Sequence, residues 1–299
     1  MGTNAFLAEG QFWRGNIHTH STRSDGVLAP ADVCRRYREA GYDFLCLSDH
    51  FMKTFGFPVT DTRLFRTNSF TTLFGAELHA PANSHGEIWH ILAAGLPEDF
   101  EPTADDETGV QLATRARAAG AFVGIAHPQW SGLTIEDGRA MASSAHAVEI
   151  YNHTCAIECA RPDGTYLLDR LSDEGHRLTA YAADDAHFRN DDGFGGWMMV
   201  KAEDNEPEAL LNAMKRGDFY SSQGPEIHEF AIADGQAHIA CSPAAMIALV
   251  GRGSHAEFRI APAIGETKLP IRAFAGDWFR LVVKDDSGKM AWSNPVWLD

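Results

Sequence analysis

Gly15-Asn16-Ile17-His18-Thr19-His20-Ser21-Thr22-Arg23-Ser24-Asp25-Gly26 is the stretch around which the rest of the chain is arranged. Residues i and i+2 of an extended strand project from the same face, so His18 and His20 can reach one metal ion together. Asp25 follows a serine-rich turn closed by Gly26, which can return a hard oxygen ligand to the same place. A pair of histidines on a polar strand is the simpler alternative. The choice between them depends on whether ligand-type residues also follow other apolar runs.

Several short apolar runs do carry or precede such residues. They span 44–48, 71–76, 88–93, 121–126, 147–151 and 178–183, and helical patterns at 30–41, 107–120, 134–142, 164–175 and 206–216 lie between them. Strands that alternate with helices predict parallel βαβ units, and ligands at many consecutive strand ends favour a closed or distorted barrel over an open sheet with one crevice. The aromatic segment 51–70 is interpreted either as a loop over the site or as an ordinary hydrophobic cover.

The chain of 299 residues is longer than a single core usually requires, so we expect one larger domain and a smaller one. From about Pro225 the pattern changes to short alternating runs separated by turn residues. Such runs are typical of a small all-β, sandwich-like domain. The prediction is therefore an α/β barrel domain over residues 1–224 and an all-β domain over 225–299.

The charge balance limits the partners of this protein. Asp and Glu number 41 and Lys and Arg 25, so the formal net charge is −16. A surface of this sign repels long nucleic acids and anionic membranes, and the partner we expect is a small molecule. The five scattered cysteines are typical of reduced thiols, and no leader pattern or membrane span is visible, which together predict a cytoplasmic protein. Cys155 and Cys159 are an unlikely soft-ligand pair because no second cysteine pair lies nearby, and the sequence gives no oligomeric state.

The ligand-type residues form one chemical set without cysteine. Imidazole and carboxylate ligands together suit Zn, Mn or Fe, and the set is too large for one ion of coordination number four to six. We therefore predict two or three divalent metal ions, with Glu77 able to bridge two of them; such ions acidify bound water and hold developing negative charge. The candidate ligands are His18, His20, Asp25, His50, Glu77, His90, His127, Asp185 and His187.

The order of these motifs resembles a known family. His-x-His, Asp49-His50, Gly75-Ala76-Glu77, a lone histidine, Ala126-His127-Pro128 and Asp185-Ala186-His187 resemble the polymerase and histidinol phosphatase (PHP) superfamily of metal-dependent hydrolases over residues 12–224. The segments 12–16, 148–152, 219–225 and 291–295 resemble its carbaryl hydrolase-like branch more loosely. The resemblance implies a distorted seven-stranded β/α barrel, up to three metals and, usually, phosphoester hydrolysis.

The resemblance also implies how the ligands divide among the ions. One ion would take His18, His20, Glu77 and Asp185, a second Glu77, His90 and His127, and a third Asp25, His50 and His187. The position of Asp25 is often His in the family. His153 stands where the family has a small residue, and its role is left open.

Other polar residues are candidates for catalysis and substrate binding. Asp49 is interpreted either as an orienting residue beside His50 or as a helix N-cap, and we place it with Asp185 and His187 among the catalytic candidates. Arg23, Lys53 and Arg161 are candidates to bind a phosphate, although each could equally lie in solvent.

Three functions are compatible with the sequence. The first is a metal-dependent phosphoesterase that acts on a small phosphorylated molecule. The second keeps the metals but hydrolyses a carbamate or a carboxylic ester, which the aromatic segment 51–70 favours slightly. The third is a non-catalytic scaffold, which would have no reason to retain the complete ligand set.

Overall fold

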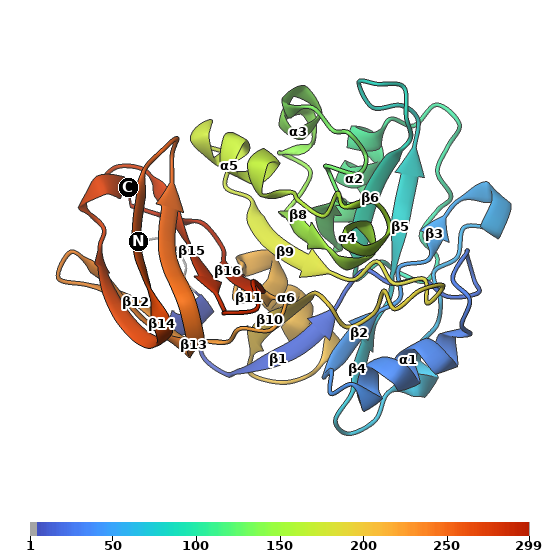
Figure 1. Cartoon of the computed structure of the whole chain (residues 1–299). Coiled ribbons are helices and arrows are strands. Elements are labelled where there is room, and N and C mark those ends of the chain that lie inside the picture. The colour runs from blue at the N-terminus through green and yellow to red at the C-terminus, as the bar shows by residue number, and fades with distance from the viewer. Residues whose placement is uncertain (1–4, 299) are drawn as a thin grey trace.

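The computed structural model describes residues 5–298 as a mixed α/β fold with two sheets (Figure 1). The smaller sheet contains, in spatial order, β3 (His50–Phe51), β5 (Gly75–Ala80), β6 (Trp89–Ala94), β7 (Phe122–Ile125), β8 (Ala147–Asn152) and β9 (Thr179–Ala183). The larger sheet has the path β12 (Ile227–Ala233), β13 (Gln236–Gly251), β15 (Trp278–Lys284), β16 (Met290–Ser293), β11 (Phe219–Ser222), β10 (Trp197–Ala202), β1 (Gln11–Asn16), β2 (Phe44–Cys46) and β4 (Thr71–Leu73). Two further strands leave that path: β14 (Ala256–Pro270) pairs with β13, and β17 (Val296–Trp297) pairs with β15.

The helices begin at residues suited to that place. Thr108 and Thr134 cap α2 and α3 by accepting hydrogen bonds from the backbone N–H three residues later, while Pro30 and Pro207 occupy the first turns of α1 and α6. The α-helices are α1 (Pro30–Glu39), α2 (Gly109–Ala118), α3 (Ile135–Met141), α4 (His153–Cys159), α5 (Thr165–Asp173) and α6 (Pro207–Arg216). The 3₁₀-helices are η1 (Ala5–Leu7), η2 (Lys53–Phe55), η3 (Arg63–Phe65) and η4 (Arg272–Phe274).

The strands are not uniformly parallel, which corrects the expectation of simple βαβ units. Parallel pairs join β1 to β2, β2 to β4, β3 to β5, β7 to β8 and β8 to β9. By contrast, β6 is antiparallel to both of its neighbours, and β10 is antiparallel to β1 and β11. An isolated parallel bridge between Thr19 and Ala186 brings the segment after β1 next to the segment after β9. The specific seven-stranded barrel stays a prediction.

Two predicted strand limits are wrong in ways that affect the site. The run 71–76 is divided between β4 and β5, so Glu77 lies inside β5 and not at the end of a strand. His90 is the second residue of the antiparallel strand β6, so it reaches the site from the beginning of its strand. The segment 51–70 holds part of β3 and the short helices η2 and η3.

The C-terminal strands are longer than the sequence pattern suggested. β13 has 16 residues and β14 has 15, and β16 pairs with β11 as well as with β15. The larger sheet therefore crosses position 225, and the division into domains at that position stays a proposal. Within residues 5–298, no helix has the length and apolar character needed to cross a membrane.

Candidate metal centre

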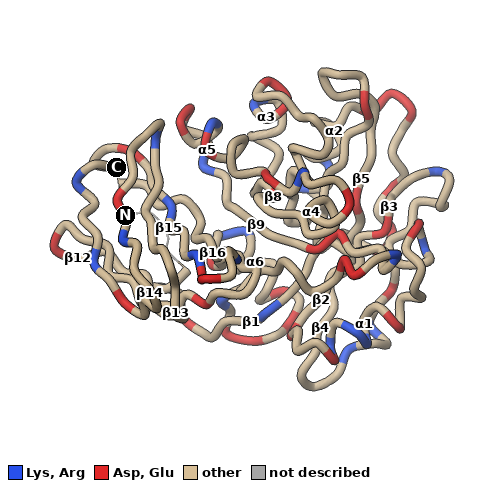
Figure 2. Tube along the Cα trace, viewed as in Figure 1, with Lys and Arg blue, Asp and Glu red and all other residues tan. Residues whose placement is uncertain are grey.

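The predicted ligands converge from six strands and the segments that follow them. His18 and His20 follow β1, His50 lies on β3, Glu77 on β5 and His90 on β6, while His127 follows β7 and Asp185 and His187 follow β9. Asp25 lies in the turn after His20. Acidic positions, red in Figure 2, are spread over much of the chain trace, in agreement with the formal charge of −16. The structure thus brings together residues that are far apart in sequence.

Glu77 lies at the middle of the cluster and is fully buried. Its Oε1 is 2.7 Å from His90 Nδ1 and 3.1 Å from His127 Nε2. Its Oε2 is 2.7 Å from His50 Nδ1, 3.5 Å from His20 Nε2 and 3.6 Å from His18 Nε2. One carboxylate therefore faces histidines on two sides, which is the arrangement of a bridging ligand.

The first ligand group contains His18, His20, Glu77 and Asp185, all of them buried. Asp185 Oδ1 is 2.9 Å from His20 Nε2 and 3.2 Å from His18 Nε2. The candidate ligand atoms lie within 4.8 Å of one another, which is close enough for one ion to contact them all. This is the group that the family resemblance implies for one ion.

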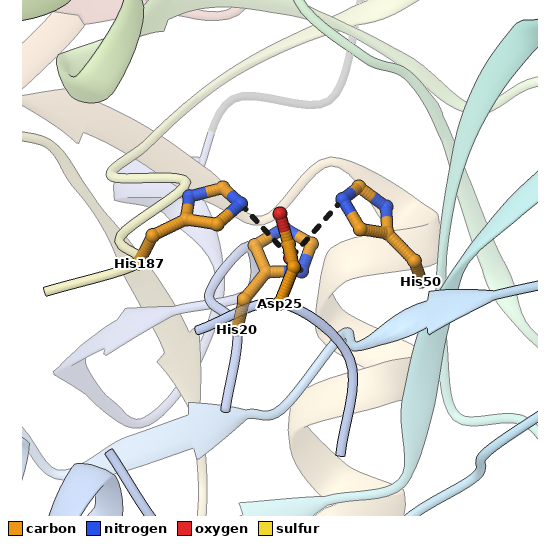
Figure 3. A group of neighbouring side chains, drawn as sticks. All are labelled: His20, Asp25, His50 and His187. Carbon is orange, nitrogen blue, oxygen red and sulfur yellow. Dashed lines mark ion pairs between the residues drawn. The ribbon is translucent and has the colours of Figure 1, made fainter. Parts of the chain in front are cut away.

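The second group contains His20, Asp25, His50 and His187 (Figure 3). Asp25 lies between the two outer rings, with its Oδ1 3.3 Å from His187 Nε2 and 3.4 Å from His50 Nε2. The other ring nitrogen of His20 faces this group, because its Nδ1 is 4.0 Å from Asp25 Oδ1. His20 therefore stands between the first two groups.

Two of the predicted ligands have unusual backbone conformations. Asp185 has φ 59° and His127 has φ 25°, in a region that residues with a side chain rarely adopt. Around Asp185 the conformation is held by three hydrogen bonds: its N–H donates to His18 O at 2.8 Å, its carbonyl accepts from Thr154 at 2.8 Å, and its Oδ2 accepts from Asn152 at 3.1 Å. Strain of this kind is concentrated at functional sites because the surroundings must impose it.

The carboxylate of Glu149 orients two of the histidine ligands. Its Oε1 accepts a hydrogen bond from His18 Nδ1 at 2.9 Å, and its Oε2 accepts from the backbone N–H of His127 at 2.6 Å. With its proton on Nδ1, His18 presents the lone pair of Nε2 to Glu77 and Asp185. Glu149 was not among the predicted site residues, although a charged residue inside the apolar strand 147–151 is a signal for such a role.

Two buried atoms test whether a divalent ion fits here. His18 Nε2 and Glu77 Oε2 are buried and have no hydrogen-bond partner. Buried polar atoms are almost always paired, and both of these are ligand-type atoms 3.6 Å apart. A cation between them would satisfy both, so the residues fit the metal that the family resemblance implies.

The protein environment adjusts the ionisation of the cluster. Burial disfavours the charged form of Glu77, but the surrounding histidines hold its pKa well below the usual range. Burial, with the charges of His50 and His187, lowers the pKa of His20 to about 4. For His187 burial acts against protonation, yet its hydrogen bond to Asp25 raises its pKa to about 9. The carboxylates are therefore ionised, as metal binding requires.

Asp49 is a predicted catalytic residue outside the ligand groups, and several hydrogen bonds fix its side chain. It is buried and accepts hydrogen bonds from the backbone N–H and hydroxyl of Ser21 and from the hydroxyl of Ser24. It thus stabilises the turn that carries Asp25. No helix begins at Asp49, because β3 starts at the next residue, so the N-cap interpretation is wrong. A catalytic role for Asp49 stays a prediction.

The three predicted cations lie in different surroundings. Arg161 lines a cavity of about 630 Å³ together with His50, His79 and His90, whereas Arg23 and Lys53 are exposed and do not line the cavities at the ligand groups. Arg189, which sequence reasoning missed, donates to Asp25 Oδ2 at 2.9 Å.

A smaller cavity of about 200 Å³ opens onto the ligand groups. It is lined by eight acidic or imidazole side chains of the cluster and its rim, and also by Trp130, Thr154, Cys155, Cys159 and Arg189. Both cysteines of the i, i+4 pair on α4 therefore reach this cavity, with Cys155 buried and Cys159 exposed. His153 does not line it, and its Nδ1 lies 2.8 Å from the hydroxyl of Tyr151.

Comparisons with solved structures agree with this fold. A two-domain protein from Bacteroides vulgatus that contains a predicted PHP-like metal-dependent phosphoesterase matches with a TM-score of 0.55 and 13% identity, covering 99% of both chains. PsfC from Pseudomonas syringae matches with a TM-score of 0.50 and 15% identity, covering 68% of this chain and 88% of PsfC. No protein-family model matches the chain, and no curated protein is similar to it in sequence. At these identities the matches show the fold alone: over 99% of its length the chain is similar in fold to the Bacteroides vulgatus protein.

Proposed function

We propose that this protein is a metal-dependent phosphoesterase that hydrolyses a small phosphorylated molecule at a centre of two or three divalent ions, Mn, Zn or Fe. The observation that carries the proposal is Glu77, a buried carboxylate with histidine nitrogens around both oxygens and with Oε2 lacking a hydrogen-bond partner. One position would take His18, His20, Glu77 and Asp185, a second Glu77, His90 and His127, and a third Asp25, His50 and His187.

The chain supplies the surroundings that this chemistry needs. When bound, divalent ions acidify water and stabilise the negative charge that develops on phosphoryl oxygens. Glu149 orients His18, and Trp130 packs its ring edge-on against His90 and His127, at centroid distances of 5.3 and 4.9 Å. Arg189 at the smaller cavity and Arg161 at the larger one are cations that can bind a phosphate.

The size and charge of the site favour a small substrate. The cavity over the ligand groups is about 200 Å³, and the formal charge of the chain is −16. Binding of long DNA or RNA depends on basic surface that releases counterions, so we propose a mononucleotide or sugar phosphate class of substrate and not a nucleic acid or a membrane.

A carbamate or carboxylic ester hydrolase is the second candidate. The cavity of about 630 Å³ beside the ligands has the apolar side chains of Met52, Ile88 and Trp130 in its wall, and these suit an apolar leaving group. The looser resemblance to the carbaryl hydrolase-like branch agrees with this alternative. A scaffold without catalysis would have no reason to retain the complete ligand set.

Substrate tests distinguish these functions. Purified protein should hydrolyse p-nitrophenyl phosphate or bis(p-nitrophenyl) phosphate, lose this activity on chelation and regain it with Mn. Faster hydrolysis of naphthyl carbamates or acetates would favour the second candidate, and turnover of neither class would leave the scaffold.

Variants of single ligands test whether this centre performs the reaction. His127→Asn and Asp185→Asn should each lower the rate on the order of 100-fold or more, by analogy with the loss of one group that stabilises the transition state. Glu77→Ala should also reduce the metal content at two positions together. His85→Asn, a change of an exposed histidine outside the ligand groups, is the control. Wild-type turnover in both ligand variants would place the chemistry elsewhere.

A further inference from the structure

His79 is a buried histidine beside the metal centre that none of the implied ligand sets includes. It is 6% exposed and lies on β5, two residues after Glu77, so the two side chains share one face of the strand. Its Nε2 is 2.8 Å from His50 Nδ1 and 3.8 Å from Glu77 Oε2. Sequence reasoning missed it because the strand was ended at Glu77.

The second ring nitrogen of His79 fixes its tautomer. Nδ1 lies 3.1 Å from the backbone carbonyl of Trp89, and a carbonyl can only accept, so Nδ1 carries the proton. Nε2 therefore presents a lone pair toward His50 and Glu77. Metal-ligating histidines almost always donate their other ring N–H in this way, to a carbonyl, a carboxylate or a water.

Four ligand-type atoms surround the space that this lone pair faces. They come from His50, Glu77, His79 and His90, one atom from each side chain, and all lie within 4.8 Å of one another. Glu77 Oε2 is the buried atom without a hydrogen-bond partner. We propose that these atoms form a further divalent-cation position in which His79 is a direct ligand. Three imidazoles and one carboxylate suit Zn, Mn or Fe.

This position shares His50 with the group around Asp25. His50 Nδ1 is 2.7 Å from Glu77 Oε2, whereas its Nε2 is 3.4 Å from Asp25 Oδ1. A neutral imidazole offers a lone pair at one nitrogen and a proton at the other. An ion at the position with His79 therefore leaves the proton on Nε2, directed at Asp25, and an ion beside Asp25 and His187 requires the opposite tautomer. The two positions compete for His50.

The inference rests on the proposed metal centre but not on the reaction, and anomalous diffraction from zinc-loaded crystals tests it directly. Wild-type protein should show anomalous density among the four ligand atoms. His79→Gln should lose that density and keep the density among His18, His20, Glu77 and Asp185. His85→Gln, on an exposed loop, should match the wild type.

The glutamine variant also separates ligation from orientation. A glutamine oxygen can still accept a hydrogen bond from His50, but it is a poor zinc ligand. If His79 only oriented His50, His79→Gln would keep the wild-type density and His79→Ala would not, and this outcome would overturn the inference. The inference would also be overturned if wild-type crystals showed anomalous density in the other ligand groups but none at the position with His79. Absence of bound zinc anywhere in the wild type would refute the proposed metal centre itself, and the two failures are thereby distinguished.

Discussion

Glu149→Gln should weaken metal binding although Glu149 belongs to none of the proposed ligand groups. Glu149 Oε1 accepts from His18 Nδ1 at 2.9 Å, while Oε2 accepts from His127 N–H at 2.6 Å and from the Asn152 amide at 3.1 Å. A glutamine has the same shape but one oxygen in place of two. It must therefore present its NH₂ group to one of these two sides.

Either orientation of the glutamine has a cost. If the NH₂ group faces His18, the ring must accept at Nδ1, and its proton moves to Nε2, where it occupies the place of the ion. If the NH₂ group faces His127 and Asn152, the buried N–H groups of these two residues lose their hydrogen-bond acceptor, which costs about 1–3 kcal/mol for each unpaired group. Loss of an orienting partner typically lowers metal affinity about 10- to 100-fold, which is about 1.4–2.8 kcal/mol.

The assay measures zinc affinity by competition with a chromophoric chelator, and in parallel the free energy of unfolding in excess chelator. Glu158→Gln is the matched control, because Glu158 is an exposed residue of the smaller cavity over the ligand groups, and its acceptor oxygen for Asn190 at 2.9 Å survives as an amide oxygen. Glu149→Gln should lower either the affinity for zinc or the free energy of unfolding in excess chelator. The control should change neither quantity. Wild-type values for Glu149→Gln in both measurements would refute the assignment of the His18 tautomer.

Three further predictions concern stability. Burial, with nearby cationic charge, lowers the pKa of His146 to about 4 from about 6.5 in the unfolded chain. The contribution of neutral His146 to the free energy of unfolding should therefore be fully present above pH 6.5 and decrease as the pH falls toward 4. His146→Asn, which can keep an acceptor for the Val123 N–H, should make the free energy of unfolding in urea depend less on pH over that range. Tyr37→Phe removes a buried hydrogen bond of 2.7 Å to Asp184 and should cost about 1–3 kcal/mol in the same assay, whereas an unchanged midpoint would mean that Asp184 is satisfied by its backbone donors. Gly75→Ala should lower the melting temperature, because the added Cβ would lie 2.3 Å from the sulfur of Cys46 and 2.5 Å from the backbone oxygen of Ala93. A wild-type melting temperature would contradict this packing.

The sequence was most informative where a ligand follows an apolar run in a regular pattern. The i, i+2 spacing of His18 and His20 and the place of Asp185 after a buried strand allowed their proximity to be anticipated, although β1 ends at Asn16, before both histidines. His90 could not be placed correctly, because a period of two does not reveal whether a strand is parallel or antiparallel to its neighbours. The metal roles of all these residues stay predictions.

Other parts of the site depend on contacts that the sequence does not encode locally. His79 was detectable, since i and i+2 share a strand face, but the strand was ended too early. Arg189 lies beside Asp25 only because the loop after β9 returns to the turn after β1, a contact between residues 164 positions apart. The pairing of β11 with β16 could not be predicted either, because the sequence pattern of a strand does not show which strand it pairs with.

The pairing of β1 with β10 affects how this protein can be synthesised. Gln11 lies opposite Ala202, and the ligand-type residues extend from His18 to His187. A ribosome adds roughly 5–20 residues per second, so the last ligand emerges roughly 10–30 s after the first. During that interval the nascent chain can offer an ion only its first few ligands. Loading of the complete proposed centre must therefore wait until the chain has emerged beyond His187, and a bound ion would then join the beginning of the chain to its middle.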